Sequence, residues 1–303
     1  MSFKIPKRYW RIAKRLRIAD LQKLDDSDSF FSEKDLFEVN IGQRSEGLFL
    51  GFYSRKGIET ALDRYEITKE LNKKGFKKLI FDMDTSDPYI HRLAIYDREK
   101  KADRLLIEVV LRKKMIEIQM PFRTHLNGRV FETLAIEWLC MQNPDQKFTR
   151  EKPRLPGQHF PGLGMASRAV EILIITAWRL NLAGLLNTPD HFHNAYLYSR
   201  IFYYLDPKIQ ARFVALCRDL KAYSVYEISW AIEWGAVIDE TTQKPMEWII
   251  GEQMVPLFSD LKNLFESREY KHFVEEQSKN YKFSMDVKKF KEYKLKTGGL
   301  NEA

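Results

Sequence analysis

The sequence predicts an α/β or α+β protein, in which a mixed β-sheet is flanked by helices and followed by a helical C-terminal extension. Three features of the chain lead to this fold class. Residues 78–141 contain short apolar segments separated by polar turns, as successive strands do. Residues 165–187 give a nearly all-apolar helix and a short apolar strand. Residues 205–303 carry apolar and aromatic side chains at helical spacing.

Length and composition indicate a folded globular protein. With 303 residues, 44% of them hydrophobic, the chain fills one large or two ordinary domains. Cys140 and Cys217 lie far apart in the sequence and fit no metal or redox spacing, so we expect buried thiols in a reducing cytoplasm. No uncharged run reaches the roughly 20 residues of a membrane-spanning helix, so we expect no transmembrane segment.

The first 40 residues form a basic N-terminal segment. Residues 1–17 hold seven Lys or Arg and no acid, and they contribute much of the net charge of +8. Tyr9, Trp10 and Ile12 are interleaved with these charges. We therefore expect a helix whose aromatic side packs on the rest of the protein while its charges face water. A weak binding surface for nucleic acid or an anionic membrane is the alternative.

The elements of the predicted sheet follow in order. Residues 48–53, LFLGFY, are a candidate strand. Residues 56–72 space their apolar side chains as a helix does, and Gly75 ends this helix. The later strands alternate apolar and charged residues in part, which is typical of an antiparallel sheet with one covered face. These candidate strands are 78–83, 91–96, 104–111, 115–120 and 131–141.

The C-terminal part is predicted to be helical. Residues 207–220, 255–265 and 268–277 each have the spacing of a helix with an apolar stripe. No clear linker separates this part from the preceding residues, so we expect it to pack on the same body. The predicted division is a basic segment at 1–40, a domain at 41–204 and a helical extension at 205–303.

A central stretch carries the densest group of chemically informative residues. The segment 159–164, HFPGLG, precedes a predicted helix at 165–180. Its glycines let consecutive backbone N–H groups converge, and the helix N-terminus favours an anion such as a pyrophosphate. An ordinary Pro-Gly turn is the alternative. After a short strand at 183–187, Thr188 and Pro189 predict the start of a second helix.

Polar side chains recur along this second helix. His191, Asn194 and Tyr198 have helical spacing and point to the same side. His193 lies two residues after His191, and two such side chains on a helix point in nearly opposite directions. They could not bind one ion together, so we predict no metal site.

These patterns resemble the GNAT superfamily of acyl-CoA-dependent N-acyltransferases. Its members carry a loop of the form Q/R-x-x-G-x-G/A that opens a helix, then a strand, and then a helix with an L-Y-x-K segment. Gly162 and Gly164 match the loop glycines, and residues 197–200, Leu-Tyr-Ser-Arg, match the helix segment. The sequence departs from the pattern at His159, where Gln or Arg is usual, and at Phe202, where Gly is usual.

The resemblance implies a GNAT-like fold over residues 41–204, with a mostly antiparallel central sheet flanked by helices. It also implies that acetyl-CoA or a longer acyl-CoA is bound and that its acyl group passes directly to an unidentified amine. By analogy with the family, Tyr198 protonates the departing thiolate. Glu137, on the strand before the loop, accepts the proton of the amine. The residues implied to bind acyl-CoA are His159, Gly162, Leu163, Gly164, Met165 and Asn194.

The sequence leaves alternatives open. One keeps the fold without catalysis, as a CoA-binding or structural module, and the departures at His159 and Phe202 favour it. In another, Glu137 is an ion-paired or strand-edge acid rather than a base. The oligomeric state is open as well, with a homodimer among the alternatives.

Overall fold

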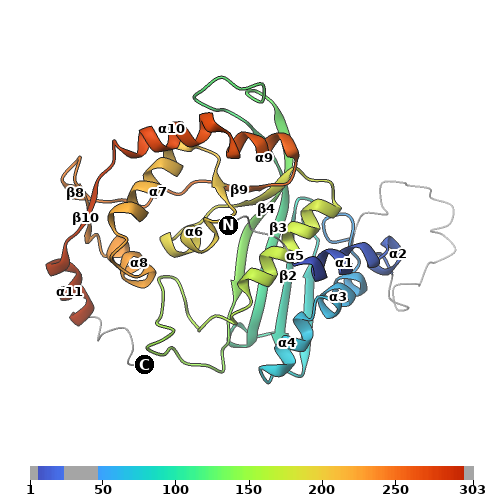
Figure 1. Ribbon diagram of the computed structural model, residues 1–303. Coiled ribbons are helices and arrows are strands. Elements are labelled where there is room, and N and C mark those ends of the chain that lie inside the picture. Colours follow the sequence, from blue (N-terminus) through green and yellow to red (C-terminus); the bar gives the residue numbers. More distant parts are fainter. Residues whose placement is uncertain (1–5, 24–46, 297–303) are drawn as a thin grey trace.

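The computed structural model describes residues 6–23 and 47–296. Among these residues, the chain forms a seven-stranded open sheet with the strand order β1-β2-β3-β4-β5-β9-β6. Neighbouring strands are antiparallel except for β4 and β5, which run parallel. Figure 1 shows helices on both sides of this sheet. The chain is therefore a mixed α/β protein with a mostly antiparallel sheet, as predicted.

Two long strands, β3 (Leu105–Glu117) and β4 (Val130–Met141), form the middle of the central sheet. A smaller sheet, in the order β10-β7-β8, lies in the C-terminal part. The remaining strands are β1 (Leu79–Asp84), β2 (Ile90–Asp97), β5 (Gly184–Asn187), β6 (Tyr203–Tyr204), β7 (Val237–Asp239), β8 (Lys244–Pro245), β9 (Gln253–Pro256) and β10 (Phe283–Met285).

Helices from the two parts of the chain cover different faces of the sheet (Figure 1). On one face lie α1 (Lys7–Arg15), α2 (Ile18–Leu21), α3 (Arg55–Arg64), α4 (Ile67–Lys73) and α5 (Ala166–Arg179). The later helices are α6 (Phe192–Tyr198), α7 (Pro207–Asp219), α8 (Val225–Glu233), α9 (Ser259–Glu266), α10 (Arg268–Ser278) and α11 (Val287–Lys296).

Three groups of buried side chains form the core. Strand side chains alternate between faces, so β4 supplies Leu134 to one group and Ala135 to another. The α5 cluster includes Leu134, Leu163, Met165, Leu173 and Ile174. The α9 cluster includes Ala135, Leu186, Met254, Leu261 and Phe265, and the α7 cluster includes Phe192, Ala195, Tyr204, Phe213 and Leu216.

The strand predicted at 48–53 is wrong. Leu50 and Gly51 have positive φ values of 57° and 69°, which reverse the chain. Only a bridge joins Phe49 and Tyr53 across this turn. The backbone amide of Leu50 donates a hydrogen bond to Nδ1 of His91 (2.6 Å), so the turn is held against β2.

The helix predicted at 56–72 is interrupted. Glu66 takes a left-handed φ of 62° between α3 and α4, and its neighbours Tyr65 and Ile67 are both buried. A continuous helix would place these two side chains on nearly opposite sides, so one of them would leave the core. By contrast, the two strands predicted within 104–120 are parts of one strand, β3.

Two later boundaries also differ from the prediction. Thr188 does not cap a helix, because α6 starts at Phe192 with His191 at its N-cap. Nε1 of Trp248 donates a hydrogen bond to the carbonyl oxygen of Pro189 (3.0 Å) and holds this segment outside the helix. The helix predicted at 255–265 starts only at residue 259, since the preceding residues form β9.

Strand β9 joins the C-terminal part of the chain to the central sheet. It lies between β5 and β6 and is antiparallel to both. Gly184 permits this approach, because a Cβ there would lie 2.6 Å from the carbonyl oxygen of Val255. Residues beyond 204 therefore contribute a strand to the sheet as well as helices around it.

Within residues 6–23 and 47–296, no helix is both long and apolar enough to cross a membrane. Cys140 and Cys217 are free and only half-buried. Burial raises the pKa of the Cys140 thiol to about 11 and that of Cys217 to about 12. Both are therefore neutral thiols near pH 7, which makes them poor nucleophiles.

Candidate functional site

The ladder between β4 and β5 is short. Their pairs run from Leu134 with Leu185 to Ile136 with Asn187, where β5 ends. Strand β4 continues to Met141, and in the described part of the chain no strand pairs with this portion on the β5 side. Apart from the carbonyl of Met141, which bonds to Leu163, backbone N–H and C=O groups along this edge are therefore available to a ligand.

A β-bulge lies where this ladder ends. Ile136 and Trp138 oppose successive residues of β3, so Glu137 is an extra residue in β4. The extra residue shifts the alternation of side chains. As a result, Ile136 before the bulge and Leu139 after it both pack against the α5 cluster.

The segment 159–164, which we call the glycine loop, is attached to the end of β4. The amide of Leu163 donates to the carbonyl oxygen of Met141 (3.2 Å), and the amide of Asn143 donates to that of Pro161 (2.7 Å). These bonds place the glycine loop at the carboxyl end of β4, beside its unpaired edge.

Buried and exposed residues alternate at the glycine loop and the start of α5. Leu163 and Met165 are buried in the α5 cluster, whereas Gly162 and Gly164 are exposed. Gly164 has a φ of 70°, which favours glycine. Helix α5 then begins at Ala166 without a side-chain cap, so the amides of its first turn can bind an anion.

Charged side chains near the glycine loop are partly neutralised. Nη1 of Arg168, in the first turn of α5, lies 3.4 Å from Oε1 of Glu70 on α4. Lys73 and, more weakly, Arg168 hold the pKa of Glu70 below its ordinary value. His159, at the start of the loop, is exposed. An anion at the loop would therefore rely chiefly on backbone amides.

Helix α6 holds two of the predicted site residues. Asn194 is half-buried in its first turn, and Tyr198 is its last residue. The Tyr198 ring packs on Phe202, with 5.9 Å between ring centroids, and on the α5 cluster that contains Leu163. Burial raises the pKa of Tyr198 above its ordinary value of 10. The phenol is therefore protonated at neutral pH and can donate a proton.

Glu137 is exposed and engaged in an ion pair. Its Oε1 lies 2.5 Å from Nε of Arg112 on β3, which leaves Oε2 for a second partner. Among the hydrogen bonds of the described residues, none joins Glu137 to Tyr198. The structure thus places Glu137 at the bulge and Tyr198 in the adjoining cluster as separate groups.

The two neighbouring histidines are closer than predicted. The rings of His191 and His193 stack with 5.4 Å between centroids and 12° between planes. The expectation of opposite directions is wrong because His191 precedes the helix, with extended φ and ψ of −128° and 151°. Burial, followed by the neighbouring His191, lowers the pKa of His193 to about 4. No group of three potential metal ligands occurs in the residues that the structure describes.

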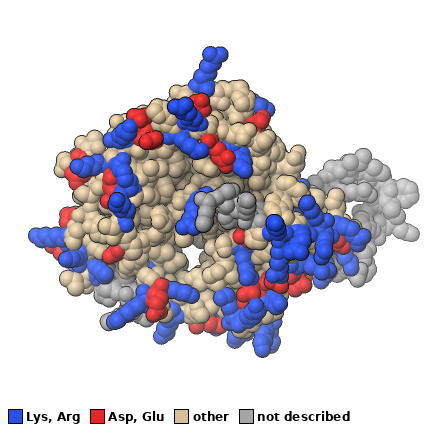
Figure 2. Space-filling model, in the orientation of Figure 1, with Lys and Arg blue, Asp and Glu red and all other residues tan. Residues whose placement is uncertain are grey.

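Helix α1 packs by its aromatic side, as predicted. Tyr9 and Ala13 are buried in the α5 cluster, and Trp10 meets Trp178 edge to face with 5.1 Å between centroids. Figure 2 shows Lys and Arg side chains gathered over the part of this face that carries α1 to α4. The exposed basic residues of α1 are Lys7, Arg8, Arg11, Lys14 and Arg15.

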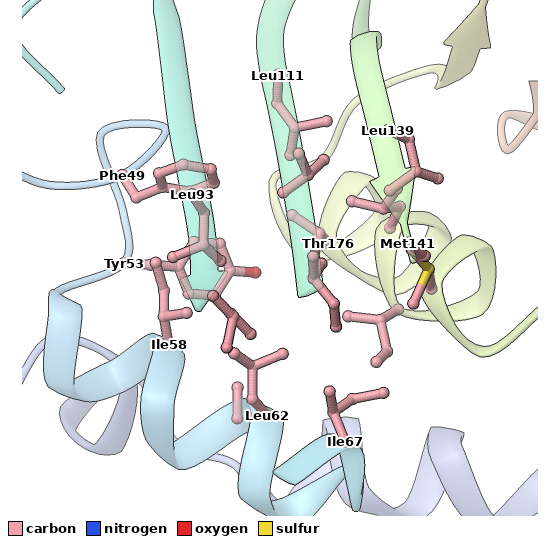
Figure 3. Close-up of a pocket in the computed structure, with 17 residues that line it drawn as sticks. Phe49, Tyr53, Ile58, Leu62, Ile67, Leu93, Leu111, Leu139, Met141 and Thr176 are labelled. Carbon is pink, nitrogen blue, oxygen red and sulfur yellow. The ribbon is translucent and has the colours of Figure 1, made fainter. Parts of the chain in front are cut away.

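An apolar cavity of about 120 Å³ lies between the sheet and helices α3, α4 and α5 (Figure 3). Reasoning from the sequence missed it. Residue spacing shows which side chains face inward, but the size of a void depends on how far apart the elements lie.

No protein-family model, curated protein or solved structure matches this chain. Its function is therefore inferred from the chemistry of the site.

Proposed function

We propose that this chain binds acyl-CoA at the carboxyl end of β4 and transfers the acyl group directly to an amine, as GNAT enzymes do. The observation that carries this proposal is the end of the β4–β5 ladder at Ile136, beside the glycine loop, which leaves the rest of β4 without a strand on that side in the described part of the chain. One ligand can then reach both a free strand edge and an anion-binding turn. Coenzyme A, with an amide-containing arm and a pyrophosphate, has groups suited to both.

The backbone of β4 would bind the amide-containing arm. The carbonyl of Met141 points to the β5 side, since it accepts a hydrogen bond from Leu163. Backbone groups alternate along a strand, so those of Leu139 point to the same side. They lie beyond the last β4–β5 pair and can bond to amides of the arm. The exposed Gly162 and Gly164 would then face the pyrophosphate.

Direct transfer requires one attack and two proton movements. The amine nitrogen attacks the thioester carbonyl carbon, the C–N bond forms, and the C–S bond breaks to release a thiolate. Oε2 of Glu137 accepts the proton lost by the amine, and Tyr198 donates its phenolic proton to the thiolate. Tyr198 carries its proton at neutral pH, as a proton donor must, and its raised pKa makes it a weaker acid than a free phenol.

A charge introduced at Gly162 tests the binding site. A Cβ at this position would meet only the Met141 carbonyl oxygen, at an ordinary 3.6 Å, so a short side chain fits. Calorimetry with acetyl-CoA and longer acyl-CoAs should show at least tenfold weaker binding for Gly162→Asp, because the carboxylate repels the pyrophosphate. Gly162→Asn, of the same size without the charge, is the control. Absence of binding by the unchanged protein, or equal affinities for the two variants, would contradict the proposal.

Release of free thiol across a panel of amines tests catalysis. Tyr198→Phe keeps the ring that packs on Phe202, so it should slow thiol release at least tenfold while leaving the affinity for acyl-CoA unchanged. Tyr196→Phe, at an exposed position of the same helix, is the matched control. Unchanged turnover in Tyr198→Phe would remove this residue from the mechanism.

The Arg112–Glu137 ion pair favours a second candidate function, a CoA-binding module without catalysis. In that case the pair only stabilises the bulge, and the chain binds acyl-CoA without releasing thiol to any amine. Glu137→Gln separates the two functions. It should abolish thiol release by a transferase, whereas a binding module would show none before or after the substitution.

The exposed basic residues of α1 support a further binding function, toward nucleic acid or an anionic membrane. Reversing Lys7, Arg11 and Lys14 to Glu leaves the buried side of the helix intact. Salt-sensitive binding to anionic vesicles or to RNA should be lost in this variant. Equal binding by both proteins would rule the function out.

We also propose the cytoplasm as the compartment of this protein. Cys140 and Cys217 are free thiols, and a reducing compartment keeps thiols in this state.

A further inference from the structure

The cavity under the sheet has an apolar wall. Strands β2, β3 and β4 supply one side, and α3, α4 and α5 supply the other, with side chains of the two sides pointing toward one another (Figure 3). Tyr53, from the turn before α3, and Thr176 of α5 are the polar residues of the wall. No charged residue lines it in the described part of the chain. Such a cavity suits a hydrocarbon rather than a polar ligand.

The cavity is large enough for several carbon atoms. An engineered cavity of about 150 Å³ with similar walls stays dry and binds benzene, a ligand of six carbons. At about 120 Å³, the cavity of this protein accommodates a chain of comparable size. Unfilled space of this kind weakens a core, because the wall atoms lack contacts on one side.

The cavity reaches the proposed thioester site. Leu139 and Met141 line it with their side chains, and both belong to the part of β4 beyond the β5 ladder. Ala169, within the first turn or so of α5, lines it as well. The carbonyl oxygen of Met141 accepts the hydrogen bond from Leu163, so this part of the wall lies beside the glycine loop.

We propose that this cavity takes the acyl chain of the thioester, so that the substrate is an acyl-CoA with about six chain carbons rather than acetyl-CoA. This inference rests on the proposed function, because it assumes that the thioester lies along the free edge of β4. The acyl chain passes between Met141 and Ala169 and fills the space between the sheet and α3. Aliphatic walls at Leu93, Val109 and Leu173 then contact it.

Binding of acetyl-, hexanoyl- and dodecanoyl-CoA to the unchanged protein tests the proposal by calorimetry. Each buried methylene contributes roughly fourfold in affinity, so hexanoyl-CoA should bind at least tenfold more tightly than acetyl-CoA. The gain should level off by dodecanoyl-CoA, whose chain exceeds the cavity. Equal affinities for acetyl- and hexanoyl-CoA would overturn the proposal that the cavity binds the acyl chain, without contradicting the proposed function. Absence of binding by all three would overturn both.

Two variants narrow the cavity from opposite walls. Ala61→Leu on α3 should reduce the preference for hexanoyl- over acetyl-CoA to less than threefold, while acetyl-CoA, whose chain does not reach α3, binds as before. Ala169→Leu on α5, beside the entry, should reduce this preference as well. Asp63→Leu adds the same side chain to an exposed position of α3 and should leave the preference unchanged. If both cavity variants keep the full preference for hexanoyl- over acetyl-CoA, the assignment of the cavity to the acyl chain is contradicted.

Free hexanoate distinguishes the acyl chain of a thioester from a free fatty acid. It lacks the groups that contact β4 and the glycine loop, so it should bind at least a hundredfold more weakly than hexanoyl-CoA. Equal affinity of hexanoate and hexanoyl-CoA would overturn the assignment to a thioester.

Discussion

The two faces of the central sheet are filled in different ways. On the α5 side, mainly aliphatic side chains leave a cavity of about 120 Å³. A second pocket, in the α7 cluster beside Tyr204 and Phe213, amounts to about 10 Å³. On the other side of the sheet, aromatic contacts fill the α9 cluster closely. Tyr203 stacks on Phe265 at 5.2 Å between centroids, and the hydroxyl of Tyr270 donates to the carbonyl oxygen of Tyr204 (2.9 Å).

Strands and helices both contribute to the difference, because β3, β4, β5 and β9 supply both clusters whereas β2 supplies only the α5 cluster. Helix α3 approaches α2 so closely at Gly57 that a Cβ there would lie 1.9 Å from the carbonyl oxygen of Leu21. This contact holds α3 close to α2. The empty volume lies between these packed helices and the sheet.

Truncating one buried leucine on each face should show the largest difference in unfolding free energy between the two faces. Leu261, fully buried in the α9 cluster, should lose about 3–5 kcal/mol of unfolding free energy in Leu261→Ala. Leu173→Ala should lose only about 2 kcal/mol, because one side of Leu173 already faces the cavity and makes fewer contacts. Urea denaturation measures both values. Equal losses would show that the two faces are packed alike.

A buried histidine, His193, makes the stability of the protein depend on pH. Helix α6, which places Phe192 and Ala195 in the α7 cluster, also buries His193 and lowers its pKa from 6.5 to about 4. Its contribution to stability is thus present above pH 6.5 and lost as the pH falls toward 4, by up to about 3 kcal/mol. In urea denaturation, His193→Gln should lose less stability over this window than the unchanged protein. His159→Gln, at an exposed position, should not differ from it.

Replacing one alanine on each face by leucine should change the unfolding free energy least, and in opposite directions. Ala211 is fully buried in the α9 cluster, so Ala211→Leu should lower the unfolding free energy by about 1–3 kcal/mol through overpacking. Ala61→Leu projects into the cavity and should raise it by about 0.5–1 kcal/mol. Alanine and leucine have similar helix propensities, so packing decides the difference. Loss of stability in both variants would refute the contrast between the faces.

The fold was predictable from sequence where local patterns and burial agree. The apolar helix α5 and the strand β4 lie close to their predicted ranges. Prediction failed where a distant residue determines the backbone. His91 holds the turn at Leu50, and Trp248 holds Pro189 outside α6. Neither contact leaves a signal in the local sequence.

The glycine loop could be found from sequence because the glycines at 162 and 164 themselves indicate a turn with accessible backbone amides. The bulge at Glu137 could not, since it depends on how β3 and β4 pair. One trace of it exists: the buried side chains change from even to odd numbers between Ile136 and Leu139. The Arg112–Glu137 pair and the cavity likewise depend on distances between elements.

The position of β9 has a consequence for synthesis. Strand β5 leaves the ribosome well before β9, its antiparallel partner. During that interval the edge of β5 can pair with other chains. Nascent chains that end before Gln253 should therefore be more prone to aggregate than the finished protein, and chaperones would act on them at this point.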